Sequence, residues 1–545
     1  MSMINIKEKL LKELKTIAEE LKIEKEIFLI EPKSYADLAT NMAMGNKNYN
    51  PIELAKEIIL RLESKKKELY LKNIEIAGPG FINFFIEQEL LVENINNVLK
   101  LGNDYGKGNR VGKINIEYVS ANPTGYLHVG HARNAAIGSA LANIVEFSGW
   151  KVTREYYIND AGNQINLLAE SVFARYQQIF DPSYIMPEES YKGEDIIWAS
   201  QEFYKKYGNK FKNAKLENEI LDLWKKESVE LFLGEIKKDL AKFKADIKIW
   251  FSEKSLYEND REVIKNAISR LANTYEKDGA TWLKTTNYGD DKDRVIIKSN
   301  GEYTYFTPDI AYHDIKFQRT NNFKVGNGIL LDVWGADHSG YIKRMQTAMQ
   351  DLGYKGENLI VLSMQLVKLM KNGEEFKMSK RKGTSFFLRD FIDLVGTDSA
   401  RFILLDRTYN SKLDFDINIA TSKNNDNPAI LVQYANARAY SLLNKANKLD
   451  KNIKAVKFNN ETDEKLISTI LEFPEIIEKS AEKYLTHLLT QYLIKLAKEF
   501  NSWYSNGSKI IGHENEESLL AIVKAVNITL ENGLKLLGLS TPHNM

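Results

Sequence analysis

Hydrophobic residues recur along the chain with two different periods, and the changes between them divide the sequence into parts. Residues 1–21 alternate leucine and isoleucine with lysine and glutamate at helical spacing, and residues 74–86 hold two strand-like runs around a Gly-Pro-Gly turn. After residue 424 the pattern is that of long amphipathic helices. We therefore predict an N-terminal α+β add-on domain (1–108), a central domain (109–424) and a C-terminal all-α domain (425–545).

The central domain begins with the pattern of a nucleotide-binding fold. Residues 113–120 are typical of a buried strand, 121–125 of a turn, and 128–146 of a helix, and a second strand is predicted at 151–158. That spacing suits a crossover between parallel strands. A charged, mostly helical stretch follows from about 165 to 290. Strand patterns then return at 294–298, 328–334 and 358–362. We interpret the charged stretch as an insertion that splits one sheet, and we predict a multidomain α/β protein with a Rossmann-like parallel-sheet core.

Composition excludes several classes of protein. No apolar run approaches the roughly 18 residues that a membrane helix needs, and the N-terminus lacks the apolar segment of a signal peptide, so we expect a cytoplasmic protein. The absence of cysteine excludes disulfides, thiol catalysis and thiolate zinc sites. With 75 basic and 74 acidic residues, a nucleic-acid partner would have to be held by local basic surfaces.

Two histidines stand at the predicted start of the helix after the first central strand. His128 and His131 are three residues apart, so both rings lie on one side of the helix N-terminus, where free N–H groups favour phosphate. Gly130 between them lets a nucleotide approach the backbone. The alternatives are two solvent-facing histidines or part of a zinc site, and the sequence offers no third ligand nearby. Phosphate contact is the interpretation that the preceding strand and turn favour.

A lysine-rich loop lies about 250 residues further on. Lys377 and Lys380, with Met378 and Ser379 between them, belong to the glycine-flanked loop 373–384. Mobile ammonium groups in such a loop can neutralise the charge of a departing pyrophosphate. A charge run is more often a solvated surface loop, but its combination with the histidine motif favours a triphosphate site.

Together these motifs resemble those of the class I aminoacyl-tRNA synthetases, and the details are similar to the arginyl-tRNA synthetase family. The segments that carry the resemblance are 117–125, 127–134, 154–164, 305–312, 334–338, 432–438 and 536–542. The resemblance spans nearly the whole chain. It implies a Rossmann-like catalytic domain with a helical insertion, an N-terminal domain that contacts tRNA, and a C-terminal helical domain that binds the anticodon.

The same resemblance implies an arginine-tRNA ligase. L-arginine would react with ATP, bound as its Mg²⁺ complex, to give arginyl-adenylate, and the arginyl group would pass to the 3′ end of tRNA(Arg). We expect no protein-bound zinc or other resident metal, no membrane partner and a monomer. Two departures from the family pattern stand out: Tyr126 lies where proline is common, and Leu431 lies where an aromatic residue is common.

A guanidinium group is planar and permanently charged, so a carboxylate beside an aromatic ring suits it. Tyr305 and Asp309, four residues apart, match the family motif for that role, and Glu117 offers a second carboxylate. Asn122 and His338 match positions implied to hold the α-amino group. The alternative is that Tyr305 belongs to the core and that Asp309 caps the following helix.

The resemblance also assigns the nucleotide and RNA contacts. Catalysis would rest on His128, His131, Lys377 and Lys380, and ATP would be bound by these residues together with Gly130, Gly335, Asp337, Met378 and Ser379. Tyr434 and Tyr504 match positions that stack on anticodon bases, although aromatic residues at helical spacing more often belong to a core. Trp503 we interpret as core.

Two other functions remain open. A class I synthetase of a different amino-acid specificity would share the histidine and lysine motifs, but not carboxylates at Glu117 and Asp309. A tRNA-binding paralogue without catalysis would keep the domains and lose the chemistry. Measuring which amino acid supports ATP-pyrophosphate exchange with tRNA present separates all three.

Overall fold

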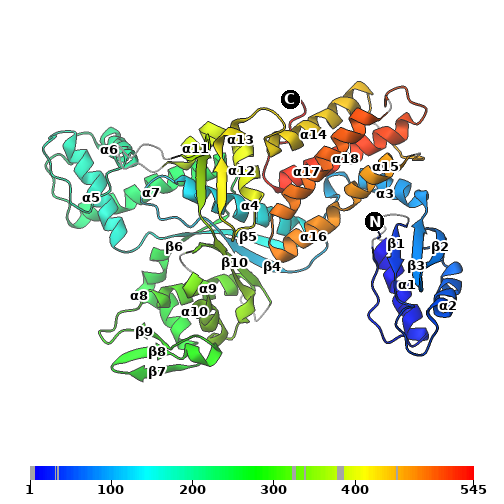
Figure 1. The fold of residues 1–545 in the computed structure, drawn as a ribbon. Helices are drawn as coiled ribbons and strands as arrows, with labels where there is room; N and C mark the ends of the chain where they lie inside the picture. The colour runs from blue at the N-terminus through cyan, green and yellow to red at the C-terminus, as the bar shows by residue number, and fades with distance from the viewer. Residues whose placement is uncertain are drawn as a thin grey trace.

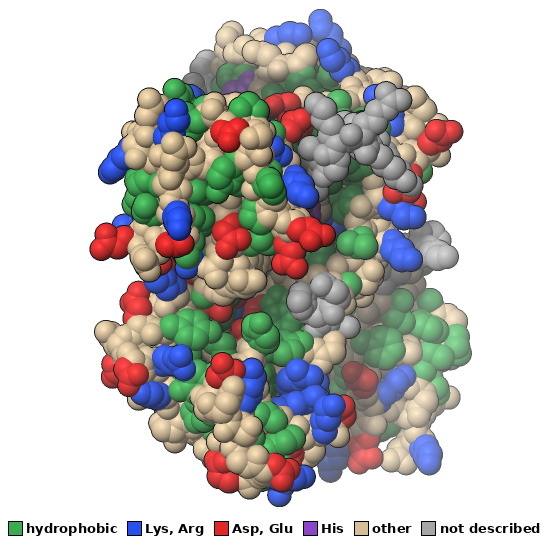
Figure 2. All heavy atoms as spheres, turned by 90° about the vertical axis from the view of Figure 1, so that its left-hand side faces the viewer, with side chains coloured by type: hydrophobic (Ala, Val, Ile, Leu, Met, Phe, Trp, Pro, Cys, Tyr) green, Lys and Arg blue, Asp and Glu red, His purple; other side chains and the backbone are tan. Residues whose placement is uncertain are grey.

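The computed structural model describes residues 6–545 except 31, 33–35, 322–326, 337–338, 377–385, 450–451, 459 and 508. Figure 1 shows an N-terminal domain at one end of the molecule, helices α5 to α7 at the other, and a sheet and a helical bundle between them. Figure 2 views the end that carries these three helices, and acidic and basic side chains are interspersed over its described surface. This mixture agrees with a net charge of +1.

The N-terminal domain packs two helices on a small antiparallel sheet of order β1-β3-β2. Its elements are α1 (Ile6–Glu20), β1 (Leu38–Thr40), α2 (Pro51–Glu63), β2 (Leu71–Ala77) and β3 (Phe81–Ile86). Helix α2 begins where the Asn50 side chain accepts hydrogen bonds from two backbone N–H groups and Pro51 occupies the first turn. Helix α3 (Gln88–Leu101) then crosses to the C-terminal helices, where the Tyr105 hydroxyl donates to the Ile470 carbonyl at 2.7 Å.

The central domain holds a five-stranded parallel sheet of order β11-β10-β4-β5-β6. These strands are β4 (Lys113–Glu117), β5 (Lys151–Ile158), β6 (Ile249–Ser252), β10 (Ile329–Gly335) and β11 (Leu359–Met364). The chain builds outward from β4 through β5 and β6, and then returns to the other side of β4 with β10 and β11. Ligands of such sheets bind where the strand order reverses, beyond the carboxyl ends of the strands. Here that point lies between β4 and β10.

Helices cover both faces of this sheet. Helix α4 (Ala132–Phe147) is buried along most of its length and packs so closely that a Cβ on Gly138 would lie 2.3 Å from the Tyr118 side chain. Helix α9 (Phe306–Thr320) packs against β4 and β10. The predicted strand, turn and helix at the start of the domain are therefore confirmed.

The predicted helical insertion is only partly helical. Helices α5 (Asn163–Gln178), α6 (Glu194–Tyr207) and α7 (Asn218–Lys242) agree with the prediction, but β6 lies within the same stretch and joins the main sheet beside β5. Strands β7 (Thr274–Lys277), β8 (Ala280–Leu283) and β9 (Arg294–Ile297) form a separate antiparallel sheet. The expectation that residues 294–298 return to the main sheet was therefore wrong. Strand β6 has only 4 residues, too few to give a periodic signal.

The remaining elements of the central domain surround the sheet. Between β6 and β9 lie the short 3-10 helix η3 (Glu253–Tyr257), α8 (Glu258–Ser269) and the 3-10 helix η4 (Thr285–Tyr288). After β10 come α10 (Ser339–Asp351), a second small sheet, and three helices. The sheet consists of β12 (Val367–Lys371), β13 (Glu374–Glu375) and β14 (Leu413–Asp416), and the helices are α11 (Leu388–Val395), α12 (Thr397–Leu405) and α13 (Ile417–Thr421).

The C-terminal domain is a helical bundle, as predicted. Its helices are α14 (Pro428–Lys445), α15 (Glu461–Leu471), α16 (Phe473–Lys483), α17 (His487–Asn506) and α18 (Glu516–Leu536), and the described residues from 428 onward contain no strand. Trp503 is 9% exposed, and its indole N–H donates to Asp463 at 2.8 Å, which confirms it as a core residue. The chain end folds back on α14, where Gln433 donates to the Ser540 carbonyl.

Candidate active site

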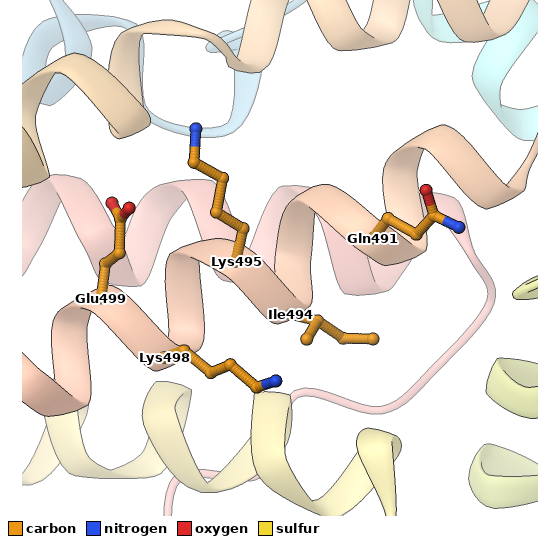
Figure 3. Close-up of a pocket in the computed structure, with 5 residues that line it drawn as sticks. All are labelled: Gln491, Ile494, Lys495, Lys498 and Glu499. Atoms are coloured by element: carbon orange, nitrogen blue, oxygen red, sulfur yellow. The ribbon is translucent and has the colours of Figure 1, made fainter. Parts of the chain in front are cut away.

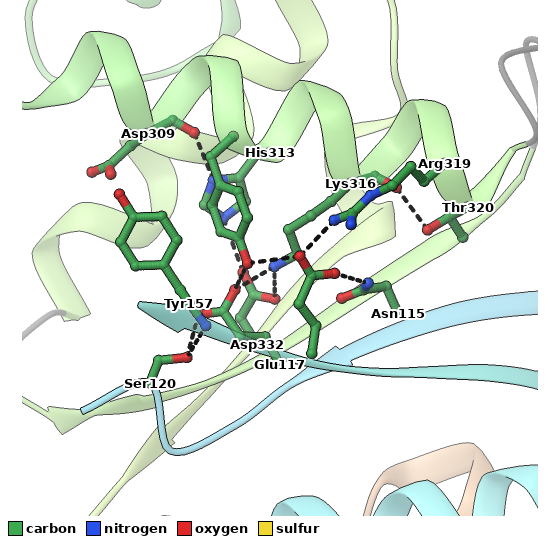
Figure 4. A network of polar contacts seen from close by, with 12 residues as sticks. Asn115, Glu117, Ser120, Tyr157, Asp309, His313, Lys316, Arg319, Thr320 and Asp332 are labelled. Carbon is green, nitrogen blue, oxygen red and sulfur yellow. Dashed lines mark hydrogen bonds and ion pairs between the residues drawn. The ribbon is translucent and has the colours of Figure 1, made fainter. Parts of the chain in front are cut away.

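Acidic side chains converge where the strand order of the main sheet reverses. Glu117 is the last residue of β4, and Asp332 on β10 lies directly beside it in the register of the two strands. Figure 4 shows both carboxylates beneath helix α9, together with Asp309, His313 and Lys316 of that helix. The site expected from the topology is therefore lined with ionisable groups.

A fully buried lysine joins the two strand carboxylates. Lys316 Nζ donates to Glu117 Oε2 at 2.7 Å and to Asp332 Oδ1 at 2.5 Å, and the Tyr312 hydroxyl also donates to Glu117, at 2.8 Å. Burial alone would lower the pKa of Lys316, but Asp332 and Glu117 raise it above its usual value. The lysine is therefore charged and compensates Glu117, so Glu117 does not offer an uncompensated carboxylate to a guanidinium.

His313 fixes helix α9 against the same strand. One ring nitrogen lies 2.9 Å from Asp332 Oδ2 and the other lies 2.8 Å from the backbone carbonyl of Asp309. Burial raises the pKa of Asp332, yet Lys316 and the hydrogen bond to His313 hold it below the usual range. These contacts fix the position of Asp309 relative to strand β10.

A second pair of carboxylates, Asp309 and Glu253, lies beside this network. The Tyr341 hydroxyl donates to Asp309 Oδ2 at 2.6 Å, and Tyr157 projects toward Asp309 (Figure 4). Burial raises the pKa of Glu253, and the negative charges of Asp309 and Asp160 raise it further. Among the ion pairs of the described residues, none involves Glu253. Two mutually repelling carboxylates walled by tyrosines suit a flat organic cation.

The sequence did not point to Glu253, because it lies within the stretch predicted as a helical insertion. It is the first residue of η3, immediately after β6. The signal that could have identified it is an acidic residue directly following the short strand-like run 249–252, since such residues lie at the carboxyl edge of a parallel sheet.

The two histidines form the turn that begins α4. His128 is the extended N-cap residue of the 3-10 helix η2 (Val129–His131), and its Nδ1 accepts the N–H of Gly130 at 3.1 Å. His131 Nδ1 accepts the N–H of His128 at 3.3 Å, and the ring centres are 3.9 Å apart. A Cβ on Gly130 would lie 2.8 Å from the His128 ring, so a larger residue here would displace that ring from its hydrogen bond to the turn.

These hydrogen bonds fix which nitrogen of each ring carries the proton. A nitrogen that accepts a backbone N–H has no proton of its own, so both neutral rings carry their proton on Nε2. Burial lowers the pKa of His128, and burial together with the neighbouring His128 lowers the pKa of His131 to about 3. At neutral pH the turn therefore offers two uncharged Nε2–H donors.

A short antiparallel pairing holds the histidine turn in place. His128 lies opposite Phe387, the Val129 N–H donates to the Phe386 carbonyl at 2.8 Å, and the Leu388 N–H donates to the Leu127 carbonyl at 2.7 Å. The segment that pairs with the turn thus begins soon after the lysine motif in the sequence. The hydrogen bonds that hold the histidine turn therefore come from Phe386 and Leu388.

The low pKa of His131 predicts how stability depends on pH. In the unfolded chain the imidazole titrates near 6.5, whereas in the folded chain its pKa is about 3, so below pH 6.5 the unfolded chain binds the extra proton. The stabilisation is complete above 6.5 and is lost as the pH falls toward 3. We expect a His131→Gln variant to lose less free energy of unfolding than the wild type between about pH 6 and pH 4 in urea titrations. Equal losses would contradict this interpretation.

The other predicted site residues are less closely gathered. Asn122 is exposed and donates to Gln164 at 2.8 Å, and Gly335 ends β10 in a half-buried position. Tyr305 precedes α9 and is 94% exposed, so its ring is not part of the wall formed by Tyr157 and Tyr341. The remaining ones lie outside the described residues: Asp337, His338, Lys377, Met378, Ser379 and Lys380.

The two predicted anticodon tyrosines lie on one outer face of the bundle. Tyr434 on α14 and Tyr504 on α17 are 39% and 40% exposed. The Arg438 guanidinium carbon is 4.7 Å from the Tyr434 ring centre and 5.1 Å from that of Tyr504, and Arg438 also donates to Asn501 at 2.6 Å. The cluster presents two aromatic faces and a cation together, and Arg438 was not predicted.

A surface hollow on the same bundle has a different character. It lies along α17 and is lined by Gln491, Ile494, Lys495, Lys498 and Glu499 (Figure 3). Lys495 forms an ion pair with Glu472 at 2.7 Å, so part of its charge is already compensated. The hollow carries none of the carboxylates or histidines described above.

Sequence and structure comparisons agree over the whole chain. Family models match at residues 5–86 (arginyl tRNA synthetase N terminal domain), 94–421 (tRNA synthetases class I (R), catalytic domain) and 432–545 (DALR anticodon binding domain). A curated arginine-tRNA ligase of Metamycoplasma arthritidis is 47% identical over 549 residues, which cover 100% of both chains. One from Bacillus subtilis is 42% identical over 94% of this chain and 93% of its own.

The fold also matches solved structures. The Thermus thermophilus arginyl-tRNA synthetase superposes with a TM-score of 0.73 at 20% identity, covering 99% of this chain and 100% of that one. In the portion of the chain that the structure describes, no helix is both long enough and apolar enough to cross a membrane.

Proposed function

The chain belongs to the arginyl-tRNA synthetase family, and from this membership we propose that it joins L-arginine to tRNA(Arg) at the site between β4 and β10. In the first step a carboxylate oxygen of arginine attacks the α-phosphorus of ATP, which gives arginyl-adenylate and pyrophosphate. In the second step a ribose hydroxyl of the terminal tRNA adenosine attacks the arginyl carbonyl and releases AMP. The observation that carries the proposal is the pair Asp309 and Glu253, in a class I fold that also carries the histidine turn.

Asp309 and Glu253 would hold the guanidinium group of arginine. Burial is the main cause of the raised pKa of Glu253, and repulsion by Asp309 adds to it; this repulsion is relieved when a cation enters between the two carboxylates. Tyr157 and Tyr341 would cover its flat faces and orient Asp309. Tyr305, being exposed, would contact arginine only from the solvent side.

Glu117 receives a different role from the one expected. Since Lys316 already compensates its charge, we assign it with Asn122 and His338 to the α-amino end of arginine, where one more hydrogen-bond acceptor suffices. The end of the pocket with Asp309 and Glu253 is then more negative in electrostatic potential than the end with Glu117 and Lys316. This difference would orient arginine with its guanidinium toward the first end and its carboxylate toward ATP.

The protein would act on ATP by positioning and by stabilising charge. The Nε2–H groups of His128 and His131 would donate to α-phosphate oxygens near Gly130, and Gly335 with Asp337 would contact the ribose. Lys377 and Lys380, with Met378 and Ser379 between them, would neutralise the pyrophosphate. The carboxylate of arginine is ionised at neutral pH, so the first step needs no general base.

The remaining contacts concern Mg²⁺, tRNA and the cell. ATP would arrive as its Mg²⁺ complex, and bases of the anticodon would stack on Tyr434 and Tyr504, with Arg438 fixing both rings. We propose that the enzyme acts as a monomer in the cytoplasm.

The test is ATP-pyrophosphate exchange with each amino acid in the presence of tRNA, followed by charging of the tRNA. We expect arginine to support exchange at least about 100-fold better than lysine, because lysine cannot form the bidentate contacts of a guanidinium. Preference for another amino acid would favour a class I synthetase of different specificity. Binding of tRNA without exchange or charging would favour a non-catalytic paralogue.

A further inference from the structure

The helical insertion is joined to the histidine turn by a cluster that the proposed reaction does not use. The cluster consists of Tyr126 before the turn, Arg389 at the start of α11, and Glu235 and Asp239 of α7. We propose that Arg389 and Tyr126 are positioning residues, which hold His128 and His131 at the place where they meet the α-phosphate. The inference rests on the proposed function of the two histidines.

Arg389 is held from three directions. One of its terminal nitrogens lies 3.0 Å from Asp239 Oδ2 and 3.0 Å from Glu235 Oε2, and its guanidinium carbon lies 3.7 Å from the centre of the Tyr126 ring. The side chain of Asp239 is 6% exposed and that of Glu235 is 12% exposed. The planar guanidinium can pair with carboxylates at its edge while it stacks on the ring, which an ammonium group cannot do.

Tyr126 is fixed to the insertion independently of Arg389. Its N–H donates to Asp195 Oδ2 of α6 at 3.3 Å, and its ring centre lies 5.2 Å from those of Trp198 and Phe387. In the arginyl-tRNA synthetase family a proline is common at this position, and proline has no N–H to donate and no aromatic ring. These contacts of Tyr126 are therefore ones that a proline at this position could not make.

The register of the short pairing explains how the cluster reaches the histidines. His128 lies opposite Phe387 in an antiparallel arrangement, and Tyr126, two residues before His128, contacts Arg389, two residues after Phe387, at one end of this pairing. Cross-strand neighbours of this kind stabilise the pairing between them. The stacked pair Tyr126 and Arg389 thus lies at the end of the two backbone hydrogen bonds that hold Leu127–Val129. These bonds also position the turn that begins α4.

Loss of Arg389 would leave Glu235 and Asp239 without their shared cation. Burial already raises the pKa of Asp239, and Glu235 raises it further, while Arg389 opposes both effects. Arg389 of α11 is the cation that bridges to these two carboxylates of α7, so without it the two helices lose this link and the ladder loses the contact at its end. A shift of about 1 Å in a positioned group can lower a rate about 100-fold.

The experiment compares Arg389→Ala with a matched control in tRNA-containing ATP-pyrophosphate exchange. Arg294→Ala is the control, because Arg294, the first residue of β9, also pairs with two carboxylates, Asp290 and Asp291, in the segment that precedes that strand. We expect Arg389→Ala to lower kcat at least about tenfold while KM for arginine stays within about twofold. Arg294→Ala should leave both constants near those of the wild type. Equal kcat in Arg389→Ala and the wild type would overturn the proposal.

A double-mutant cycle tests whether Arg389 acts through the histidine turn. If it does, Arg389→Ala should cost less than about twofold in a His128→Ala, His131→Ala background. Full additivity would overturn the positioning role. If the histidine substitutions themselves leave kcat unchanged, the function proposed for the turn fails instead, so the two failures are distinguishable.

Substitutions of Tyr126 extend the test to variants that fold more readily. Tyr126→Phe keeps the ring that Arg389 stacks on and should retain most of the wild-type kcat, whereas Tyr126→Ala should resemble Arg389→Ala. Circular dichroism and thermal melts establish that each variant is folded. If both Tyr126 variants are folded and fully active, the proposal is wrong regardless of how Arg389→Ala behaves.

Discussion

Replacing Asp309 by asparagine is expected to raise KM for arginine about 100-fold, because a guanidinium group would be left facing a neutral amide in a partly buried pocket. KM for ATP should change little, since ATP would bind at the histidine turn. The measurement is steady-state ATP-pyrophosphate exchange with tRNA present, with arginine and ATP varied in turn. The amide has nearly the shape of the carboxylate, so the change removes charge rather than packing.

The same helix offers a matched control for this substitution. Asp314 lies on α9 five residues after Asp309, but it pairs with Arg270 at 2.7 Å. Asp314→Asn should therefore lower the melting temperature and leave KM for arginine unchanged. An unchanged KM in Asp309→Asn, or an equal rise in both variants, would contradict the assigned role.

A substitution of Glu253 tests the same role in arginine binding. If Asp309 and Glu253 share one guanidinium, Glu253→Gln should also raise KM for arginine, and the double variant should cost less than the sum of the two single changes. Citrulline, which has the shape of arginine without its charge, should discriminate further. The ratio of arginine binding to citrulline binding should fall in both single variants.

The sequence predicted those parts of the molecule whose geometry is local. The histidine turn depends on residues within one helix start, and the C-terminal helices follow from periodicity, so sequence patterns were sufficient to predict both. The stacking of Arg438 between Tyr434 and Tyr504 joins two helices, and the sequence pointed only to the two tyrosines.

The electrostatics of the proposed arginine pocket could not be predicted, because they depend on residues far apart in sequence. In the sequence Glu117 is a suitable ligand for a guanidinium group. In the structure Lys316, 199 residues away, donates a hydrogen bond to it and compensates its charge. Glu253 meets Asp309 only because the 4-residue strand β6 joins the edge of the sheet. One signal was available: Tyr312, His313 and Lys316 put polar groups on the buried face of α9, and buried polar groups require partners.

Substitutions of His128 are expected to separate its capping role from its proposed role in the reaction. Its Nδ1 accepts the N–H of Gly130 and caps the turn, whereas its Nε2 carries the proton proposed to meet the α-phosphate. A glutamine amide reaches the position of Nε2, and an asparagine amide reaches only that of Nδ1. We therefore expect His128→Gln to keep most of kcat, and His128→Asn and His128→Ala to lose about 100-fold to 1000-fold, the usual cost of one preorganised donor.

Stability should follow a different order from kcat. Asparagine is among the best N-cap residues, so His128→Asn should unfold at a denaturant concentration equal to or above that of the wild type, while His128→Ala should lose about 1 kcal/mol. Activity and stability measured on the same three variants then rank them differently: glutamine first for kcat, asparagine first for stability. If kcat instead followed stability, the histidine would act as a cap alone, and the Nε2–H donor would have no part in the reaction.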